Sequence, residues 1–185
     1  MKKSNLILIS ALIAIVFFSL AFQLTVHSYI KEDKANKVPE VFRSEERKTD
    51  SFGSIKTGER LRILLFQDSI QSVTVKANNS IIDSVQTSVD DGELLIKMSK
   101  DIRKKDSIVV EISCPEISAL RLSGKSYVES NGILSGEQLR LELDGSSSVN
   151  LELNYKTVLY NNTSDGDIEI QGDIKNIQIT NQPKE

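Results

Sequence analysis

The second half of the chain repeats itself at a nearly constant spacing. The segment Leu120–Val128 (LRLSGKSYV) can be placed over Leu141–Val149 (LELDGSSSV) and then over Tyr160–Ile168 (YNNTSDGDI). Each unit starts with an apolar or aromatic residue, has a second apolar residue eight positions later, and carries small polar residues between them. The number of residues that separates Leu141 from Tyr160 also separates Tyr160 from Ile179, which lies in an incomplete fourth unit. A period of roughly 20 residues is typical of chains whose successive coils stack on one another.

Two short strands per unit, with Ser, Gly, Asn and Asp at the corners, favour a β-solenoid. In such a fold the backbone of one coil pairs with the next, and inward Leu, Val and Ile side chains stack into one core. The spacing therefore predicts that Leu120 lies beside Leu141, and Leu141 beside Tyr160. A Greek-key sandwich, which also has a strand about every 8–12 residues, is the alternative. It would fold the chain after Leu120 into facing antiparallel hairpins.

Alternation of apolar and polar residues runs through residues 51–185. Leu61 and Ile63 alternate with arginines, and Val73 and Val75 alternate with polar residues. A period of two is typical of strands with one buried face. No window of this region shows a sustained helical stripe of apolar residues, so it is predicted to form an all-β domain.

The amino-terminal residues have the pattern of a membrane signal. Two lysines precede the run Leu6–Phe22, which contains no charge, Gly or Pro and is followed by further apolar residues. About 20 helical residues cross a bilayer core, and lysines hold their end in the cytoplasm. We predict that residues 1–30 form an uncleaved signal anchor or transmembrane helix, with membrane contact through residues 6–30. A signal peptide cleaved near Ala21 is the alternative, because small residues stand where a signal peptidase reads.

Charged residues dominate the next segment. From Lys31 to Asp50, twelve of twenty residues are charged, and Pro39 interrupts the segment. A segment of this composition buries little apolar surface. We therefore predict that residues 31–50 form a charged spacer between the membrane segment and the domain.

The composition excludes several classes of protein. The chain has one Cys and one His, whereas a disulfide scaffold needs paired cysteines and a Cys/His zinc site needs three or four ligands. His27 lies beside the apolar segment, which leaves no histidine for a Ser-His-Asp triad. A net charge of −3 disfavours a nucleic-acid binder. We expect no nucleic-acid partner, metal or cofactor, and we expect Cys114 to be a small buried residue.

Two motif tests give no catalytic residue. Ser123–Ser126 contains the Gly-Lys-Ser of a phosphate loop, but Ala119 stands where that motif needs a glycine, so a β-turn is predicted. Solenoid enzymes that act on polysaccharides can place acids on adjacent coils for general acid/base chemistry. At the offset that sets Leu141 over Tyr160, Glu142 falls over Asn161, and the other acids of these two coils also fall over neutral residues. We therefore expect the chain not to be an enzyme.

Three segments occur in an order that resembles one known family. They are Val73–Ile82 (VTVKANNSII), Val89–Ile96 (VDDGELLI) and Ile112–Gly124 (ISCPEISALRLSG). Their succession is similar to that of the auto-transporter adhesin head (GIN) domain family, over about residues 52–181. The resemblance implies a fold like the right-handed β-helices of Gram-negative envelopes. One departure is Asp144-Gly145, where family members often carry a further Ser-Gly corner.

These observations together predict a membrane-anchored, non-catalytic interaction or adhesion-type module of the cell envelope. It would present a polar β-solenoid face to an envelope protein or a glycan. The domain would face the periplasm from an inner-membrane anchor, with the cell surface as the alternative. Two other functions stay open: an envelope polysaccharide-acting β-helix enzyme, and a structural or signalling subunit of an envelope complex. No individual residue is predicted to bind a ligand.

Overall fold

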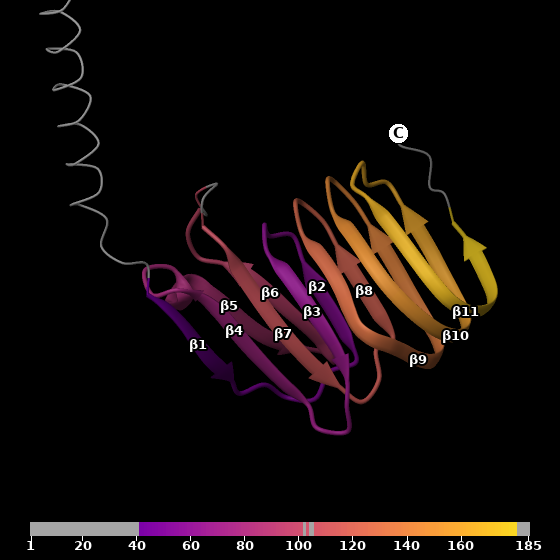
Figure 1. Ribbon diagram of the computed structural model, residues 1–185, viewed down its shortest axis with the longest axis horizontal. Coiled ribbons are helices and arrows are strands. Elements are labelled where there is room, and N and C mark those ends of the chain that lie inside the picture. Colours follow the sequence, from indigo (N-terminus) through magenta and orange to yellow (C-terminus); the bar gives the residue numbers. More distant parts are fainter. Residues whose placement is uncertain (1–40, 102, 104–105, 181–185) are drawn as a thin grey trace, which may run out of the picture. The chain divides into compact units, whose positions relative to one another are not determined.

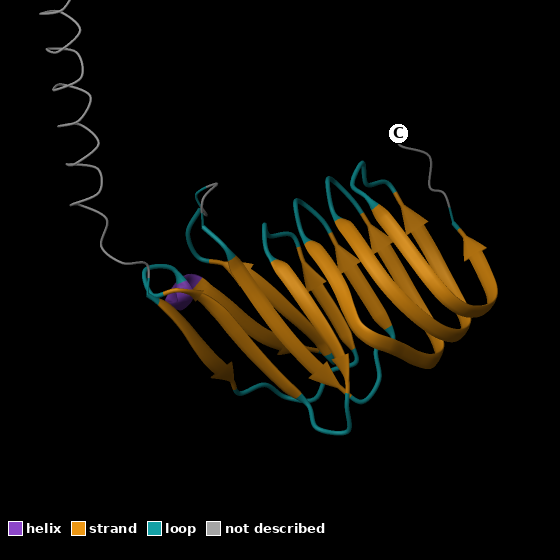
Figure 2. Ribbon diagram, viewed as in Figure 1, coloured by secondary structure: helices purple, strands orange, loops and turns teal. Residues whose placement is uncertain are grey.

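The computed structural model describes residues 41–101, 103 and 106–180, and this part of the chain is mostly β-strand (Figures 1 and 2). Eleven strands form one sheet, accompanied by a 3₁₀ turn, η1. The elements are β1 (Phe42–Arg47), β2 (Ser54–Thr57), β3 (Arg62–Gln67), β4 (Ser72–Asn78), η1 (Ile82–Ser84), β5 (Val85–Asp90), β6 (Glu93–Met98), β7 (Ile108–Cys114), β8 (Ala119–Leu122), β9 (Tyr127–Leu143), β10 (Ser148–Asn162) and β11 (Ile168–Ile179). The predicted all-β fold is confirmed.

The second half of the domain stacks its strands in parallel and in the predicted register. β8 pairs with β9 and places Leu120 beside Leu141, and β9 pairs with β10 and places Leu141 beside Tyr160. β11 continues the series, with Ile179 beside Tyr160. The strand register that the spacing predicts is thus confirmed. Within residues 119–180 these pairs are parallel, so the facing antiparallel hairpins of the sandwich alternative are not found there.

The central coil of the stack comes from the beginning of the domain. β2 lies between β6 and β8, and β3 lies between β7 and β9, with parallel pairing on both sides (Figure 1). Ile55 on β2 therefore pairs with Leu94 on one side and Leu120 on the other. After β2 and β3 the chain continues through β4 to β7 on one side of this central pair, and β8 to β11 then follow on the other side.

The side of the stack beyond β6 and β7 is antiparallel. β5 pairs with β6, β4 with β7 and β1 with β4, each in the antiparallel sense. Parallel strand pairing therefore covers β2, β3 and β6–β11, which is less than the whole of the predicted region 51–185. Only β5 and β6 are joined by a short turn, at Asp91-Gly92, whereas β4 pairs with β7 and β1 with β4 across longer segments of the chain.

Strand β1 corrects the prediction of a charged spacer over residues 31–50. Phe42–Arg47 pairs along its length with β4 and is part of the compact domain. An edge strand tolerates charge because its side chains reach solvent while its backbone pairs on one side. Glu45 forms an ion pair with Arg47 at 3.0 Å, so opposite charges on the same strand are balanced. Charge density alone therefore did not mark a segment outside the fold.

The predicted membrane segment, residues 1–30, lies outside the described residues, as do residues 31–40 of the predicted spacer. In the part of the chain that the structure covers, no helix is long and apolar enough to cross a membrane. The signal anchor through residues 6–30 therefore stays a prediction.

The core consists of rows in which inward side chains of successive coils lie next to one another. Two such rows are Leu94–Ile55–Leu120–Leu141 and Val110–Ile63–Val128–Val149. Every residue of both rows is at most 1% exposed. Because burying one such side chain stabilises the fold by about 1.5–3 kcal/mol, these rows hold the coils together.

Turns stack from coil to coil along one edge of the domain (Figure 2). The predicted turn at Ser123–Ser126 is confirmed, and its Gly124 has a φ of 66°. A Cβ on Gly124 would lie 2.2 Å from the carbonyl oxygen of Gly58 in the neighbouring coil. The hydroxyl of buried Ser126 donates to the carbonyl oxygen of Ser123 at 3.1 Å. Both the backbone conformation and the close approach thus require a glycine at this corner.

Candidate functional site

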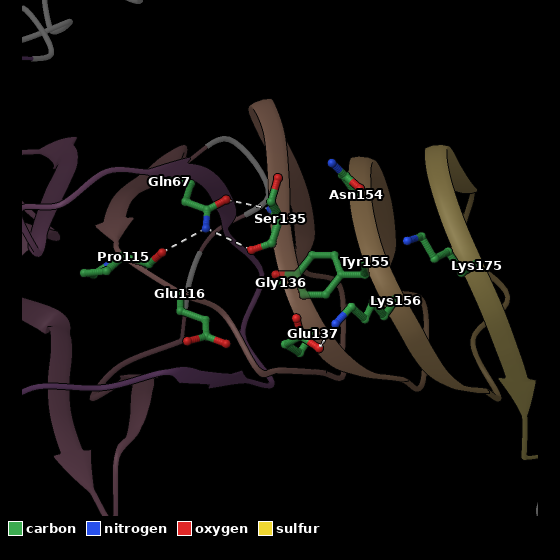
Figure 3. A pocket seen from close by; sticks show the side chains of 10 residues that line it. All are labelled: Gln67, Pro115, Glu116, Ser135, Gly136, Glu137, Asn154, Tyr155, Lys156 and Lys175. Atoms are coloured by element: carbon green, nitrogen blue, oxygen red, sulfur yellow. Dashed lines mark hydrogen bonds and ion pairs between the residues drawn. The ribbon is translucent and has the colours of Figure 1, made fainter.

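A cleft of about 470 Å³ opens where β3 ends and the middle parts of β9, β10 and β11 pass (Figure 3). The connection between β7 and β8 closes one side of it. Its lining is rich in amide, amine and carboxylate groups. The lining residues are Gln67, Pro115, Glu116, Ser135, Gly136, Glu137, Asn154, Tyr155, Lys156 and Lys175.

The side chain of Gln67 fixes one wall of the cleft. Its Nε2 donates to the carbonyl oxygens of Pro115 at 2.8 Å and Ser135 at 2.9 Å, and its Oε1 accepts from the backbone N–H of Ser135 at 2.6 Å. Gln67 is the last residue of β3, so its amide takes the place of a further strand residue beside β9. The wall is therefore held by three hydrogen bonds before any ligand arrives.

Tyr155 forms the floor of the cleft. Its side chain is buried, and its hydroxyl donates to the carbonyl oxygen of Ile117 at 2.8 Å. Gly136 makes room for the ring, because a Cβ there would lie 2.6 Å from Cε1 of Tyr155. Burial raises the pKa of Tyr155 above its usual value, so the phenol stays neutral. Tyr155 is thus a support for the site and not an acid or a base within it.

Charged groups of both signs stand on the rim, in a column that crosses the coils. Tyr155 pairs with Gly136 on β9 and with Ile174 on β11, so the residues that follow these three are neighbours from coil to coil. Lys156 forms an ion pair with Glu137 at 2.6 Å, and both side chains are exposed. Exposed pairs of this kind add little to stability, so these charges remain able to contact a ligand.

A second hollow of about 280 Å³ lies beside a charged ladder over β6, β8 and β9. Arg121 pairs with Glu93, and its Nε lies 3.2 Å from Oε2 of Glu142. Arg140 approaches Glu142 at 3.5 Å. The predicted register of Glu142 over Asn161 is confirmed, so no acid faces Glu142 from the next coil. This ladder therefore balances its own charges and does not present paired carboxylates.

Cys114 behaves as the sequence predicts. It is fully buried and free, and burial raises the pKa of its thiol to about 11. A thiol with that pKa stays protonated near neutral pH and is a poor nucleophile. Among residues 41–101, 103 and 106–180, no three His, Cys, Asp or Glu side chains gather in a way that could hold a metal ion. His27 lies outside that set.

Sequence reasoning singled out none of the cleft residues. The repeat does contain a signal for part of the site, because Gly136, Tyr155 and Ile174 follow one another at equal intervals along the chain. The spacing could therefore have placed the rim residues that follow them in one column. Gln67 and Glu116 come from segments outside the repeat, so only the three-dimensional structure brings them to the cleft.

Solved structures with low sequence identity share the fold. A putative adhesin from Bacteroides fragilis NCTC 9343 matches with a TM-score of 0.67 and 19% identity, over 73% of this chain and 64% of that chain. A putative lipid binding protein from Parabacteroides distasonis ATCC 8503 matches with 0.60 and 16%, over 77% and 68%. A putative adhesin from the same organism matches with 0.59 and 16%, over 77% and 71%. This chain therefore spans less than two thirds of the length of the Bacteroides protein.

Identities of this size relate the folds alone. No curated protein matches the chain. The motifs between Val73 and Gly124, which carry the resemblance to one family, nevertheless fall inside a longer region of the chain that matches a family model. Because that family's model, described as "putative auto-transporter adhesin, head GIN domain", matches residues 51–182, the chain belongs to this family.

Proposed function

We propose that this chain is a non-catalytic, adhesion-type binding module of the cell envelope, and that it holds a glycan in the cleft around Gln67 and Tyr155. The observation that supports this proposal is the convergence of amide, hydroxyl, amine and carboxylate groups from successive coils on one opening. Ligand sites combine a concave shape with a few converging polar groups. The description of the family as an adhesin head agrees with a binding role.

The chemistry of the lining suits a sugar. Sugar hydroxyls both donate and accept hydrogen bonds, and the exposed amide of Asn154 can do the same. Lys156 and Glu137 add a donor and an acceptor that tolerate partial exposure to water. Because Gln67 is already fixed by its three hydrogen bonds, little conformational entropy is lost at this wall when a ligand binds.

The same groups argue against an enzyme acting on polysaccharide. Glycoside hydrolysis needs a pair of carboxyl groups free to act as acid and as nucleophile or base. Two carboxylates, Glu116 and Glu137, line the cleft, and that of Glu137 is in an ion pair with Lys156. The hydroxyl of Tyr155 donates to the carbonyl oxygen of Ile117. An ion-paired Glu137 is poorly suited to act as nucleophile or base, which favours a binding role for the cleft.

The location in the envelope is part of the proposal. Residues 6–30 would anchor the chain in the inner membrane, and residues 31–40 would form a charged spacer. The stacked coils would act as a rigid β-solenoid that presents the cleft in the periplasm, with the cell surface as the alternative. Protease digestion of intact cells and of spheroplasts distinguishes the two locations, because only a surface domain is cut in intact cells.

Glycan binding is tested with the full chain in detergent, on an array of envelope glycans. Asn154→Ala should weaken binding about fivefold, which corresponds to the loss of one hydrogen bond. Gln86→Ala, which removes an exposed amide from β5, is the matched control and should leave binding unchanged. Release of sugar by the wild-type chain would favour the enzyme alternative and overturn the proposal. The structural or signalling alternative would be favoured by two results together. No glycan would bind, and an envelope protein would co-purify with the wild-type chain but not with the Asn154→Ala variant.

A further inference from the structure

Strand β11 ends the stack with an edge that is open within the described residues. It pairs with β10 on one side, and no strand of the described chain pairs with its other side (Figure 1). An open edge presents a row of backbone donors and acceptors to which another strand can add. This inference goes beyond the glycan site, because it concerns the end of the stack, and of the cleft residues only Lys175 lies on this strand.

The inward side chains of β11 are mostly isoleucines that lie against the last row of the core. Each is in register with a buried or half-buried residue of β10. The pairs are Val149–Ile168, Leu151–Ile170, Val158–Ile177 and Tyr160–Ile179. No further coil covers them within the described chain, so Ile177 and Ile179 remain 54% and 63% exposed. A continuous apolar row left open at a strand edge indicates that something covers it.

The spacing of these isoleucines is symmetric. Along the sequence, Ile168 and Ile179 are equally far from the midpoint between Asp173 and Ile174. The same is true of Ile170 and Ile177. If a second copy of β11 is turned end for end and paired with the first, Ile168 lies opposite Ile179, and Ile170 lies opposite Ile177. Directly opposite residues of an antiparallel pair point to the same face, so all four side chains stay on the core side. A shift by one residue would set each of these four isoleucines opposite an outward side chain.

The polar residues fit the same register. Glu169 lies opposite Gln178 of the second copy, so no two like charges face each other there. Lys175 lies opposite Gly172 of the second copy. Because this glycine has no side chain, the lysine has room to reach Asp173 of the second copy, which is adjacent to the glycine. Long side chains reach beyond the directly opposite position, and the two-fold symmetry repeats this contact. The edge is therefore complementary to itself along its two arms, as an isologous interface requires, whereas at the centre half-buried Ile174 lies opposite Asp173 of the second copy.

We propose that two copies of this chain associate end to end through antiparallel pairing of their β11 strands. Each copy then continues the core of the other, and the part of the cleft around Gln67 and Asn154 stays outside the contact. The occupant of the open edge is thus a second copy of the chain.

Analytical ultracentrifugation of the full chain in detergent, over a dilution series, tests the proposal. Ile177→Lys should raise the dimer dissociation constant at least about 100-fold, because it removes two buried isoleucines per dimer and places a charge in the core row. Ile133→Lys on β9 is the matched control, since Ile133 is also 54% exposed but lies two strands away. It should leave the constant unchanged. Any association through residues 6–30 is common to all these variants.

Two further variants test the register. Asp173→Lys should weaken the dimer about two- to fivefold, and adding Lys175→Asp should restore it by exchanging the charges. Under oxidation, chains carrying Glu169→Cys should form a covalent dimer with chains carrying Gln178→Cys, and neither variant should do so alone, because Cβ atoms of opposite residues are close enough for a disulfide. A monomer at every concentration, or a dimer that Ile177→Lys and Ile133→Lys affect equally, would overturn the proposal. Ile177→Lys should keep wild-type glycan binding, so the failure of either proposal can be recognised separately.

Discussion

Replacement of Gly124 by Ala should destabilise the domain more than the same replacement at Gly92. Both glycines have positive φ, 66° and 74°, so an added side chain costs about 1–2 kcal/mol of backbone strain at either position. The surroundings differ. A Cβ at Gly92 meets nothing within 4 Å, whereas a Cβ at Gly124 would lie 2.2 Å from the carbonyl oxygen of Gly58. The comparison therefore isolates the effect of packing one turn against the next.

The magnitude follows from how far the turns must move. Real Cβ contacts are longer than 3.0 Å, so the turns at Gly58 and Gly124 must separate by about 1 Å. Hydrogen bonds at this corner oppose that movement: Ser123 N–H donates to the Thr57 carbonyl oxygen at 2.9 Å, and Ser146 N–H donates to that of Gly124 at 2.7 Å. Overpacking of this kind costs about 1–3 kcal/mol. We therefore expect the free energy of unfolding to fall by about 2–5 kcal/mol for Gly124→Ala and by about 1–2 kcal/mol for Gly92→Ala.

Urea titrations of the full chain in detergent, monitored by circular dichroism, measure both decreases in the free energy of unfolding. Asparagine provides a second arm, because it adopts positive φ more readily than alanine. Gly92→Asn should recover part of the loss caused by Gly92→Ala, whereas Gly124→Asn should recover little, since its Cβ meets the same oxygen. Equal losses for Gly124→Ala and Gly92→Ala would refute the argument that stacked turns hold the coils at a fixed separation.

Three further predictions concern the cleft and the buried thiol. Tyr155→Phe should lower the free energy of unfolding by about 1–2 kcal/mol in urea titrations, because the buried carbonyl oxygen of Ile117 loses its donor. Gln67→Ala should lower it by about 2–3 kcal/mol and speed hydrogen exchange at the Ser135 amide; an unchanged exchange rate would contradict the role of Gln67 as a substitute strand. Burial raises the pKa of Cys114 from its ordinary 9.0 to about 11, so the unfolded chain releases this proton first as pH rises. The stability that Cys114 contributes should be complete below pH 9 and fall toward pH 11, and Cys114→Ala should show a smaller fall over that range.

The register of the last coils could be predicted because each coil repeats the one before it. Leu120, Leu141 and Tyr160 begin successive units, and their pairing partners lie one unit away along the chain. Small residues mark each corner, where the chain must turn tightly. When the partner of a strand is fixed by a constant offset, periodicity in the sequence contains the register directly.

The place of β2 could not be predicted in this way. Ile55 pairs with Leu94 and Leu120, and no constant offset links these three residues. Several strands of the domain have similar alternation, so nothing local identifies which of them lies next to β2. β1 was missed for another reason: its charges resemble those of a spacer, but an edge strand accommodates them.

The position of the cleft follows from a change in coil length. β3 has 6 residues and ends at Gln67, whereas β9 has 17 and continues around the coil. Pairing between the two strands stops at Leu65 and Ser130, and pairing of β9 with β8 begins only at Arg140, so the backbone of β9 between Ser130 and Arg140 has no strand beside it on that side. Backbone donors and acceptors need partners, and the amide of Gln67 supplies them at Ser135.

Space beyond that amide is not filled by another coil, and it is the opening lined by Asn154 and Tyr155. In the regular rows, by contrast, the inward side chains are buried against those of the neighbouring strands, which pair in register. A ligand can therefore gain most at the step between the short coil and the long one, where polar groups converge on unfilled space. For this reason we expect binding at the step, and we expect substitutions of exposed residues along the regular rows to leave it unchanged.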